Sequence, residues 1–328
     1  MADPISHVNV WPNDDELVVT WRGGSEEISV FVSDDPDDPG VDVRAPDERG
    51  RTVLVRSEQR QYVHLFDPAE GFVVAADRRI EMDGPSNFRD LGGYPTLDGG
   101  TTRWGRVFRS DGLHELSERD HGRFRELDVT VVFDLRTRAE AEQAPDRLPA
   151  GVDYVHMPMS SDVAQQRGLL ERIVDGDLTK FDEDDMAEGY LRMLEGFGEY
   201  LAGVVGAVAE GHGVLFHCTA GKDRTGITAM TLLGLAGVAD AHILDDYELS
   251  ARYRQTAPEG TSWFAERIRE AGHDPGDFHA MWGSPRPAMR KTLEGFRERW
   301  GDHDTYVRSI GVGDEIADAA RARLRAGD

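Results

Sequence analysis

The stretch GVLFHCTAGKDRTGITAMTLLGLAGV, residues 213 to 238, decides how the surrounding chain folds. It begins with a short, wholly apolar run, which is typical of a buried parallel strand. It ends with a segment in which nearly every residue is apolar or small, which indicates a helix buried on all sides. The letters CTAGKDR between them join a strand end to a helix start. The stretch therefore predicts a strand, a tight loop and a buried helix.

Such a junction is where open α/β sheets bind ligands, because free backbone N–H groups and the helix N-terminus face one small volume. Gly221 lets the backbone turn tightly enough to wrap its amides around a tetrahedral anion. We therefore expect a phosphate cradle, built from Thr219, Ala220, Gly221, Lys222, Asp223 and Arg224.

Cys218, the only cysteine, lies inside this predicted cradle. Unpaired amides, the helix dipole and the Arg224 guanidinium all favour its thiolate form. Arg224 follows six positions later, where the curl of the loop brings its planar fork over a bound phosphate. A lone cysteine is usually an inert core residue. With His217 and Thr225 also in register, however, the pattern favours a nucleophile for phosphoryl transfer.

Composition sets wider limits on the fold and on the partners. The 328 residues suffice for one large domain and a smaller one. No apolar run is long enough to span a bilayer, and the N-terminal residues do not resemble a signal peptide. We expect a cytoplasmic protein without an integral membrane segment, although export by another route stays open. One cysteine forms no internal disulfide and no zinc-thiolate cluster, and we expect neither a metal nor a cofactor.

The net charge of −25 repels nucleic acid and anionic lipid at long range, which disfavours both as partners. The same acidic balance is typical of salt-adapted or high-GC hosts, so no function follows from it.

Residues 1–80 predict a small β domain. ELVVTW, EISVFVS, RTVLVR, YVHLF and GFVVAA are short, rich in β-branched and aromatic residues, and separated by Gly, Asp and Pro clusters. The pattern predicts a β-sandwich, and LVVTW followed by SVFVS is similar to strands of a fibronectin type III module. A partner-binding module and a structural addition to the next domain are both open for this region, and the second is favoured.

Residues 81–328 alternate between strands and helices. RVFRS, VTVVFDL, VDYVHMP and GVLFH predict strands, and the apolar spacing from Met186 to Val208 predicts one helix of about 25 residues that stops at Gly211. In the last 85 residues the spacing of the apolar residues predicts helices. The alternation predicts an α/β fold with a mainly parallel sheet flanked by helices.

HCTAGKDRTG resembles the signature of the cysteine-dependent protein tyrosine phosphatases, and more narrowly a bacterial group with HCxxGKDRTG. NFRDLGGY at 87–94, GRVFRSDGL at 105–113 and FDLRTRAEAEQAPD at 133–146 also match that group. The resemblance implies that Cys218 forms a phosphocysteine and that Arg224 binds the phosphate and stabilises the transition state. It also implies that Thr225 hydrogen-bonds the sulfur and that His217 orients the loop.

The general acid implied for this group is Asp223, within the signature. Asp162 and the acidic cluster 182–185 are alternative acids on another segment. Asp134 is expected to brace Arg224. The residues Asn87, Arg89 and Asp90 predict a hydrogen-bonded turn that supports the site, and Arg136 predicts a partner for a carboxylate. Lys222 is either a solvated loop residue or a contact to a second substrate phosphate.

The expected activity is hydrolysis of protein phosphotyrosine. A phosphoinositide phosphatase is the main alternative, although only Lys222 is basic where Thr219 and Ala220 are neutral. Arsenate reductases usually need further cysteines, which this chain lacks. A non-catalytic phosphate-binding module is the other class of function. Residues 159–186 and the helices after 240 are expected to cover the pocket, by resemblance to the same bacterial group.

Overall fold

The computed structural model describes residues 5–40, 43–159, 169–254, 263–281 and 283–326. Its contacts divide the chain into two compact units, residues 1–80 and 81–328. No helix within these described ranges is both long and apolar enough to cross a membrane.

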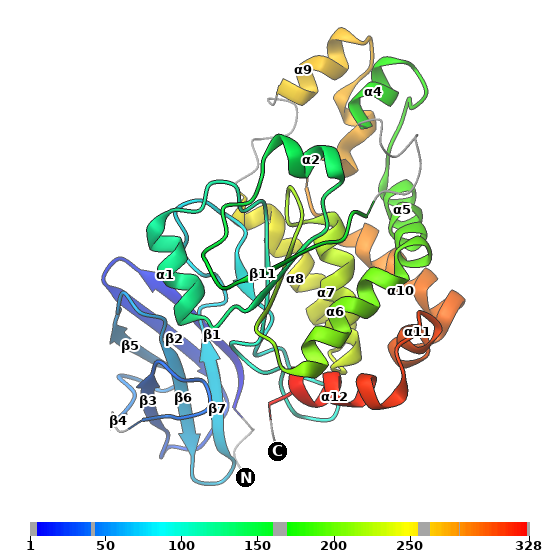
Figure 1. Cartoon of the computed structure of the whole chain (residues 1–328). Coiled ribbons are helices and arrows are strands. Elements are labelled where there is room, and N and C mark those ends of the chain that lie inside the picture. Colours follow the sequence, from blue (N-terminus) through cyan, green and yellow to red (C-terminus); the bar gives the residue numbers. More distant parts are fainter. Residues whose placement is uncertain (1–4, 41–42, 160–168, 255–262, 282, 327–328) are drawn as a thin grey trace. The chain divides into compact units, whose positions relative to one another are not determined.

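The first unit is built from two antiparallel sheets (Figure 1). Its strands are β1 (Ser6–Asn13), β2 (Glu16–Arg22), β3 (Ser29–Ser33), β4 (Val43–Arg44), β5 (Arg51–Val55), β6 (Tyr62–Asp67) and β7 (Gly71–Ala76). One sheet has the order β1-β2-β5 and the other β4-β3-β6-β7. Val19 and Trp21 of the first sheet share an apolar cluster with Val63 and Leu65 of the second. The predicted β-sandwich architecture is confirmed.

The second unit has one five-stranded sheet in the order β11-β10-β12-β9-β8. Its strands are β8 (Arg89–Asp90), β9 (Val107–Ser110), β10 (Val131–Asp134), β11 (Asp153–His156) and β12 (Val214–His217). The pairs β10–β11, β10–β12 and β12–β9 are parallel, whereas β8 pairs with β9 antiparallel. The mainly parallel sheet is therefore confirmed. Its register places Asp134, His217 and Ser110 side by side at the carboxyl ends of three strands.

Helices make up most of the remaining described chain of this unit. They are α1 (Glu118–Glu126), α2 (Arg138–Gln143), α4 (Leu169–Val174), α5 (Glu183–Gly196), α6 (Gly198–Glu210), α7 (Asp223–Leu235), α8 (Asp240–Tyr253), α9 (Trp263–Glu270), the 3-10 helix η1 (Pro275–Met281), α10 (Arg286–Trp300), α11 (His303–Ser309) and α12 (Asp314–Leu324). The helix α7 contacts α5, α6, α8, α11 and α12 (Figure 1), and most of its residues are buried. The quoted stretch is thus the centre of the unit's core.

The prediction of one 25-residue helix was wrong, because two helices, α5 and α6, meet at Phe197. Phe197 has φ −122° and ψ 23°, outside the helical range. Gly198 packs so closely on Ile310 that a Cβ there would lie 2.4 Å from its side chain. The break lets α6 approach Ile310, a tertiary contact that helical spacing does not reveal.

Candidate active site

The signature loop leaves the carboxyl end of β12 and enters α7 at Asp223. Gly221 has φ +62°, and a Cβ on it would lie 2.6 Å from the carbonyl oxygen of Ser110. The loop therefore turns in a way that only glycine tolerates. Cys218 is 1% exposed, and no described side chain caps the N-terminus of α7. The first amides of this helix are free to bind an anion.

Two buried side chains hold the loop from behind. Asn87 donates from Nδ2 to the carbonyl oxygens of Ala220 and Gly221, both at 3.1 Å. Arg109 donates from Nη2 to the carbonyl oxygen of Gly221 at 2.8 Å. The N–H and the C=O of a peptide group point in opposite directions. Because Asn87 and Arg109 bind the loop carbonyls on one side, the amides of the same peptide groups point to the other side, toward the anion position.

Asp246 of α8 anchors this support. Its carboxylate pairs with Arg89 at 2.9 Å and with Arg109, and accepts from the Tyr94 hydroxyl at 3.0 Å. Burial and the neighbouring charge of Arg89 lower the pKa of Arg109 to about 10. Arg89 bonds to Asp246 and to Asn87, which binds the loop, and its supporting role stays a prediction. Asp90 instead accepts from the amides of residues 92 and 105 and shapes the preceding turn.

Arg224 pairs with Glu140 of α2 through two hydrogen bonds, Nη1–Oε2 at 2.7 Å and Nη2–Oε1 at 2.8 Å. A third N–H, on Nη1, donates to the carbonyl oxygen of Leu135 at 3.3 Å. A guanidinium has five N–H groups. The two that remain, on Nε and Nη2, form one edge of the fork and have no partner among the described residues. This edge matches a bidentate contact to phosphate.

Charge keeps this clamp ionised. Burial lowers the pKa of Arg224, but the hydrogen bonds that it donates to Glu140 and its electrostatic interaction with Cys218 outweigh burial and hold the pKa well above its usual range. Burial raises the pKa of Glu140, yet the Arg224 guanidinium holds it well below its usual value. Thr219 also donates to Glu140, at 2.6 Å.

The expectation that Asp134 braces Arg224 was wrong. Asp134 ends β10 directly beside His217 of β12, and it pairs with Arg136 at 2.7 Å. Arg136 therefore has the carboxylate partner that was predicted for it. Arg224 projects from α7 toward the short helix α2, where Glu140 is the carboxylate within reach. Sequence reasoning missed Glu140 although it lies within the matched stretch 133–146.

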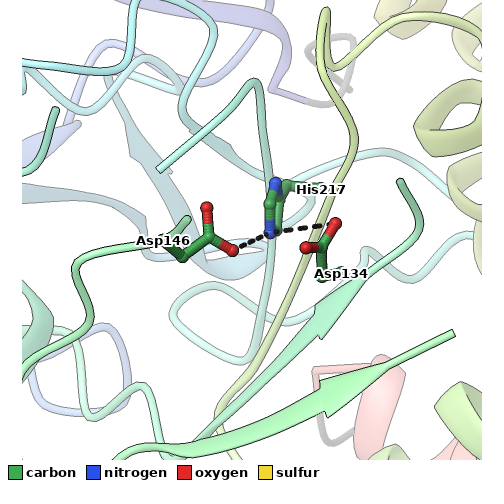
Figure 2. A group of neighbouring side chains, drawn as sticks. All are labelled: Asp134, Asp146 and His217. Atoms are coloured by element: carbon green, nitrogen blue, oxygen red, sulfur yellow. Dashed lines mark ion pairs between the residues drawn. The ribbon is translucent and has the colours of Figure 1, made fainter. Parts of the chain in front are cut away.

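His217 lies between two carboxylates, as Figure 2 shows. Its Nε2 is 2.9 Å from Asp146 Oδ2 and 3.7 Å from Asp134 Oδ1. These three groups are close enough to hold a metal ion. Arg136, however, lies 2.7 Å from Asp134 and 2.9 Å from Asp146, so a guanidinium already supplies the positive charge. The cluster fits a buried charge network beneath Cys218 better than a cation site.

Asp223 and Lys222 occupy the entrance to α7. Oδ1 of Asp223 accepts from the Tyr190 hydroxyl and lies 3.4 Å from Lys222 Nζ. Lys222 is buried, and Nζ donates to the carbonyl oxygens of Met281 at 3.2 Å and Gly283 at 2.8 Å. The expectation of a solvated residue is wrong, because this lysine is buried and its ammonium is bonded inside the protein. Its contact to a second substrate phosphate stays a prediction.

Thr225 lies under the loop, and its hydroxyl is buried with no hydrogen-bond partner among the described residues. The bond to sulfur is not formed in this structure, and the role expected of Thr225 stays a prediction. Ala220 contributes its carbonyl oxygen, which Asn87 binds, and it is partly exposed.

The alternative acids lie elsewhere. Asp162 falls outside the described residues. Asp182 caps α5 through the amides of Asp184 at 3.0 Å and Asp185 at 3.2 Å, and Lys180 lowers its pKa to about 2. The described part of the expected covering segments includes α4, α9 and η1, which share a small apolar cluster around Ile173, Ile268 and Phe278 (Figure 1).

Comparisons with known proteins agree with this geometry. The model of a tyrosine phosphatase family matches residues 80–326. A tyrosine-protein phosphatase of Nostoc commune is 32% identical over 222 residues, which cover 66% of this chain and 73% of the relative. The triple specificity protein phosphatase PtpB of Mycobacterium tuberculosis is 30% identical over 212 residues, 58% of this chain and 74% of the relative. The solved structure of TpbA from P. aeruginosa is 15% identical, covers 63% of this chain and 86% of its own, and has a TM-score of 0.27, too low to carry an argument.

Proposed function

Because this chain belongs to the tyrosine phosphatase family, whose members hydrolyse phosphate monoesters, we propose that Cys218 is its nucleophile and Asp223 its general acid. The Cys218 thiolate attacks phosphorus, the bond from phosphorus to the leaving oxygen breaks, and Asp223 gives that oxygen a proton. Asp223 then takes a proton from water as the water oxygen attacks phosphorus. The sulfur–phosphorus bond breaks, the thiolate is regenerated and inorganic phosphate leaves.

The observation that carries this proposal is the free edge of Arg224. Glu140 and Leu135 engage three of its five N–H groups and leave two, the N–H on Nε and the second N–H on Nη2, without a partner in the described chain. Because Cys218 interacts electrostatically with the same guanidinium, the sulfur and the free edge belong to one site. Phosphate held by that edge and by the loop amides faces the sulfur, and the clamp tightens as charge develops on the phosphoryl oxygens.

We propose protein phosphotyrosine as the substrate. A phosphoinositide with several phosphates needs further cations around the loop, and Lys222, the one basic candidate among the variable positions, is bonded to Met281 and Gly283. A chain with a net charge of −25 is also repelled by an anionic membrane surface. We place the reaction in the cytoplasm, where a single reactive thiol stays reduced.

The test is phosphate release in EDTA and reductant, from a phosphotyrosine peptide, a phosphoserine peptide and a soluble short-chain phosphoinositide. Wild type should act on phosphotyrosine most rapidly, and Cys218→Ser should bind the same peptide but release no phosphate. Turnover by Cys218→Ser would contradict the nucleophile. Faster release from the phosphoinositide would select the alternative substrate, and Lys222→Met should then lower that activity alone. Binding without release by wild type would indicate a non-catalytic module.

We also propose that residues 1–80 and 81–328 are separate domains and that the first is a fibronectin type III-like module. The support is the pairing of a three-stranded sheet, β1-β2-β5, with a four-stranded sheet, β4-β3-β6-β7, around one apolar cluster.

A further inference from the structure

Two buried tyrosines on different helices form a hydrogen-bonded chain that ends at Asp223. Tyr190 of α5 is 2% exposed and Tyr247 of α8 is 1% exposed. The Tyr190 hydroxyl donates to Asp223 Oδ1 and lies 2.8 Å from the Tyr247 hydroxyl. Their rings meet edge to face with centroids 6.2 Å apart. Nothing in the signature or in the mechanism above uses either residue.

The direction of the hydrogen bonds follows from counting protons. Each tyrosine hydroxyl has one proton to donate, and a carboxylate only accepts. The proton of Tyr190 therefore points at Asp223, and Tyr247 donates to Tyr190 rather than to the sulfur of Met186, which lies farther away at 3.6 Å. The chain runs from Tyr247 through Tyr190 to Asp223, and each bond polarises the next.

Tyr190 keeps its proton throughout the working range. Burial and then the negative charge of Asp223 raise its pKa well above the usual value. Burial and the same carboxylate also raise the pKa of Tyr247 far above its usual value. Neither hydroxyl ionises at neutral pH, so Tyr190 is a permanent donor to Asp223.

The two oxygens of Asp223 are consequently different. Oδ1 accepts from Tyr190 and faces the Lys222 ammonium at 3.4 Å. Oδ2 has no hydrogen-bond or ion-pair partner in the described parts of the chain. In a protonated carboxyl, an oxygen that already accepts a hydrogen bond and faces an ammonium is the carbonyl oxygen, and the proton resides on the other oxygen. Asp223 side-chain atoms are 35% exposed, which leaves Oδ2 accessible to a leaving group.

We propose that Tyr190 is a positioning residue for general acid catalysis, which fixes Oδ1 as the acceptor so that Oδ2 carries the transferred proton. This inference rests on the proposed role of Asp223 as the acid. Its effect depends on the leaving group, because an oxygen with a high pKa needs its proton in the transition state and one with a low pKa does not. Tyr190 thus widens the range of esters that the enzyme cleaves.

The experiment measures kcat/KM for aryl phosphates whose phenols have pKa values from about 4 to about 10. This parameter reports the step that forms phosphocysteine. Wild type should show a shallow dependence on the leaving group. Asp223→Asn should lose about 10²-fold to 10⁴-fold for the poorest leaving group and little for the best. Tyr190→Phe should lose about 10-fold to 100-fold for the poorest, again with little loss for the best. Tyr247→Phe should show a smaller loss of the same pattern.

Tyr200→Phe is the matched control, because the Tyr200 ring, in α6, stacks on Phe197 at the junction of α5 and α6, and its hydroxyl has no described contact with Asp223. It should leave the dependence unchanged. An equal loss by Tyr190→Phe for every ester would mean that Tyr190 supports only the fold, and no loss would also overturn the inference. If Asp223→Asn shows no leaving-group effect, the acid assignment itself fails and the inference falls with it. The slope is a ratio between substrates, so partial unfolding of a variant does not alter it.

Discussion

Arg224 is held by a carboxylate that the signature does not contain. Glu140 accepts from the Nη1–Nη2 edge of the guanidinium with bonds of 2.7 and 2.8 Å and leaves the adjacent Nε–Nη2 edge for phosphate. An unheld arginine would have to lose side-chain entropy when each substrate binds, whereas Glu140 orders it beforehand. Glu140 therefore orients the clamp and does not itself touch the substrate.

Glu140→Gln should lower kcat/KM for an aryl phosphate by about 10-fold to 100-fold, because one charged hydrogen bond is worth ~1.5–3 kcal/mol. Most of the loss should appear in KM and in the affinity for inorganic phosphate, since the thiolate is untouched. Glu142→Gln, an exposed change on the same short helix, should have no effect. Equal losses in the two variants would show that only helix charge matters.

The same pair predicts the pH range of this effect. The folded pKa of Glu140 is depressed below its usual value of 4.5. Its contribution is therefore fully present above pH 4.5 and is lost only as pH falls toward the folded pKa. The Glu140→Gln deficit should be constant between about pH 5 and 8 when both proteins are assayed in parallel. A deficit that disappears toward pH 5 would contradict the assignment.

Some of these residues could be predicted from the sequence and others could not. Cys218, Arg224 and Asp223 follow one another in a single loop, so their spacing alone indicates shared chemistry. Glu140, Asp246 and Tyr190 come from α2, α8 and α5. Which carboxylate on α2 faces Arg224 depends on the position and orientation that α2 adopts after β10. A single sequence contains no local pattern that predicts tertiary contacts between side chains from separate helices.

At the scale of elements, the conformation of the loop between β12 and α7 is fixed by contacts with neighbouring elements rather than by bonds within the loop. Asn87 and Arg109 bind its carbonyls, and the Ser110–Asp111 backbone lies directly behind Gly221. Parallel strands place these groups together, because β9 and β12 end at the same edge of the sheet. The anion site is therefore a property of the sheet edge as well as of the loop.

Gly221→Ala should lower kcat/KM by at least about 100-fold while the protein still folds. The new Cβ would lie 2.6 Å from the Ser110 carbonyl oxygen and 2.7 Å from the Asp111 nitrogen. The loop must therefore move, and its amides would no longer point at the phosphate position. Gly237→Ala is the matched control, since φ there is +84° but nothing lies within 4 Å of a Cβ. Both changes should cost ~1–2 kcal/mol of stability from backbone strain, measured by urea unfolding. Similar activities in the two variants would contradict the close packing of the loop.

Elements whose pattern is local were predicted well, and those shaped by tertiary contact were not. The strands β9, β10, β11 and β12 correspond to the apolar runs expected in the sequence. The interruption between α5 and α6 depends on the contact of Gly198 with Ile310, more than 100 residues away. Helical periodicity continues across Phe197, so it gave no sign of the break.

For the whole molecule, the net charge of −25 opposes the charge of the reaction's substrate. A phosphate monoester is anionic, and Arg224, the cation that we propose binds it, is largely buried at 16% side-chain exposure. A substrate therefore approaches through a repulsive field and is bound by a short-range clamp. Such a field selects among peptides by their flanking charge before the phosphate reaches the loop.

The acidic field should give opposite salt responses for two phosphotyrosine peptides that differ only in their flanking residues. Between about 0.02 and 0.2 M salt the screening length shortens from roughly 20 Å to below 10 Å. kcat/KM for an Asp-flanked peptide should rise a few-fold, because its repulsion is screened, whereas kcat/KM for a Lys-flanked peptide should fall. Two equal slopes would show that residues near Cys218, and not the acidic surface, govern approach. Opposite slopes would mean that the acidic surface favours basic phosphopeptides, and the field would then contribute to specificity beyond the contacts of the phosphate loop.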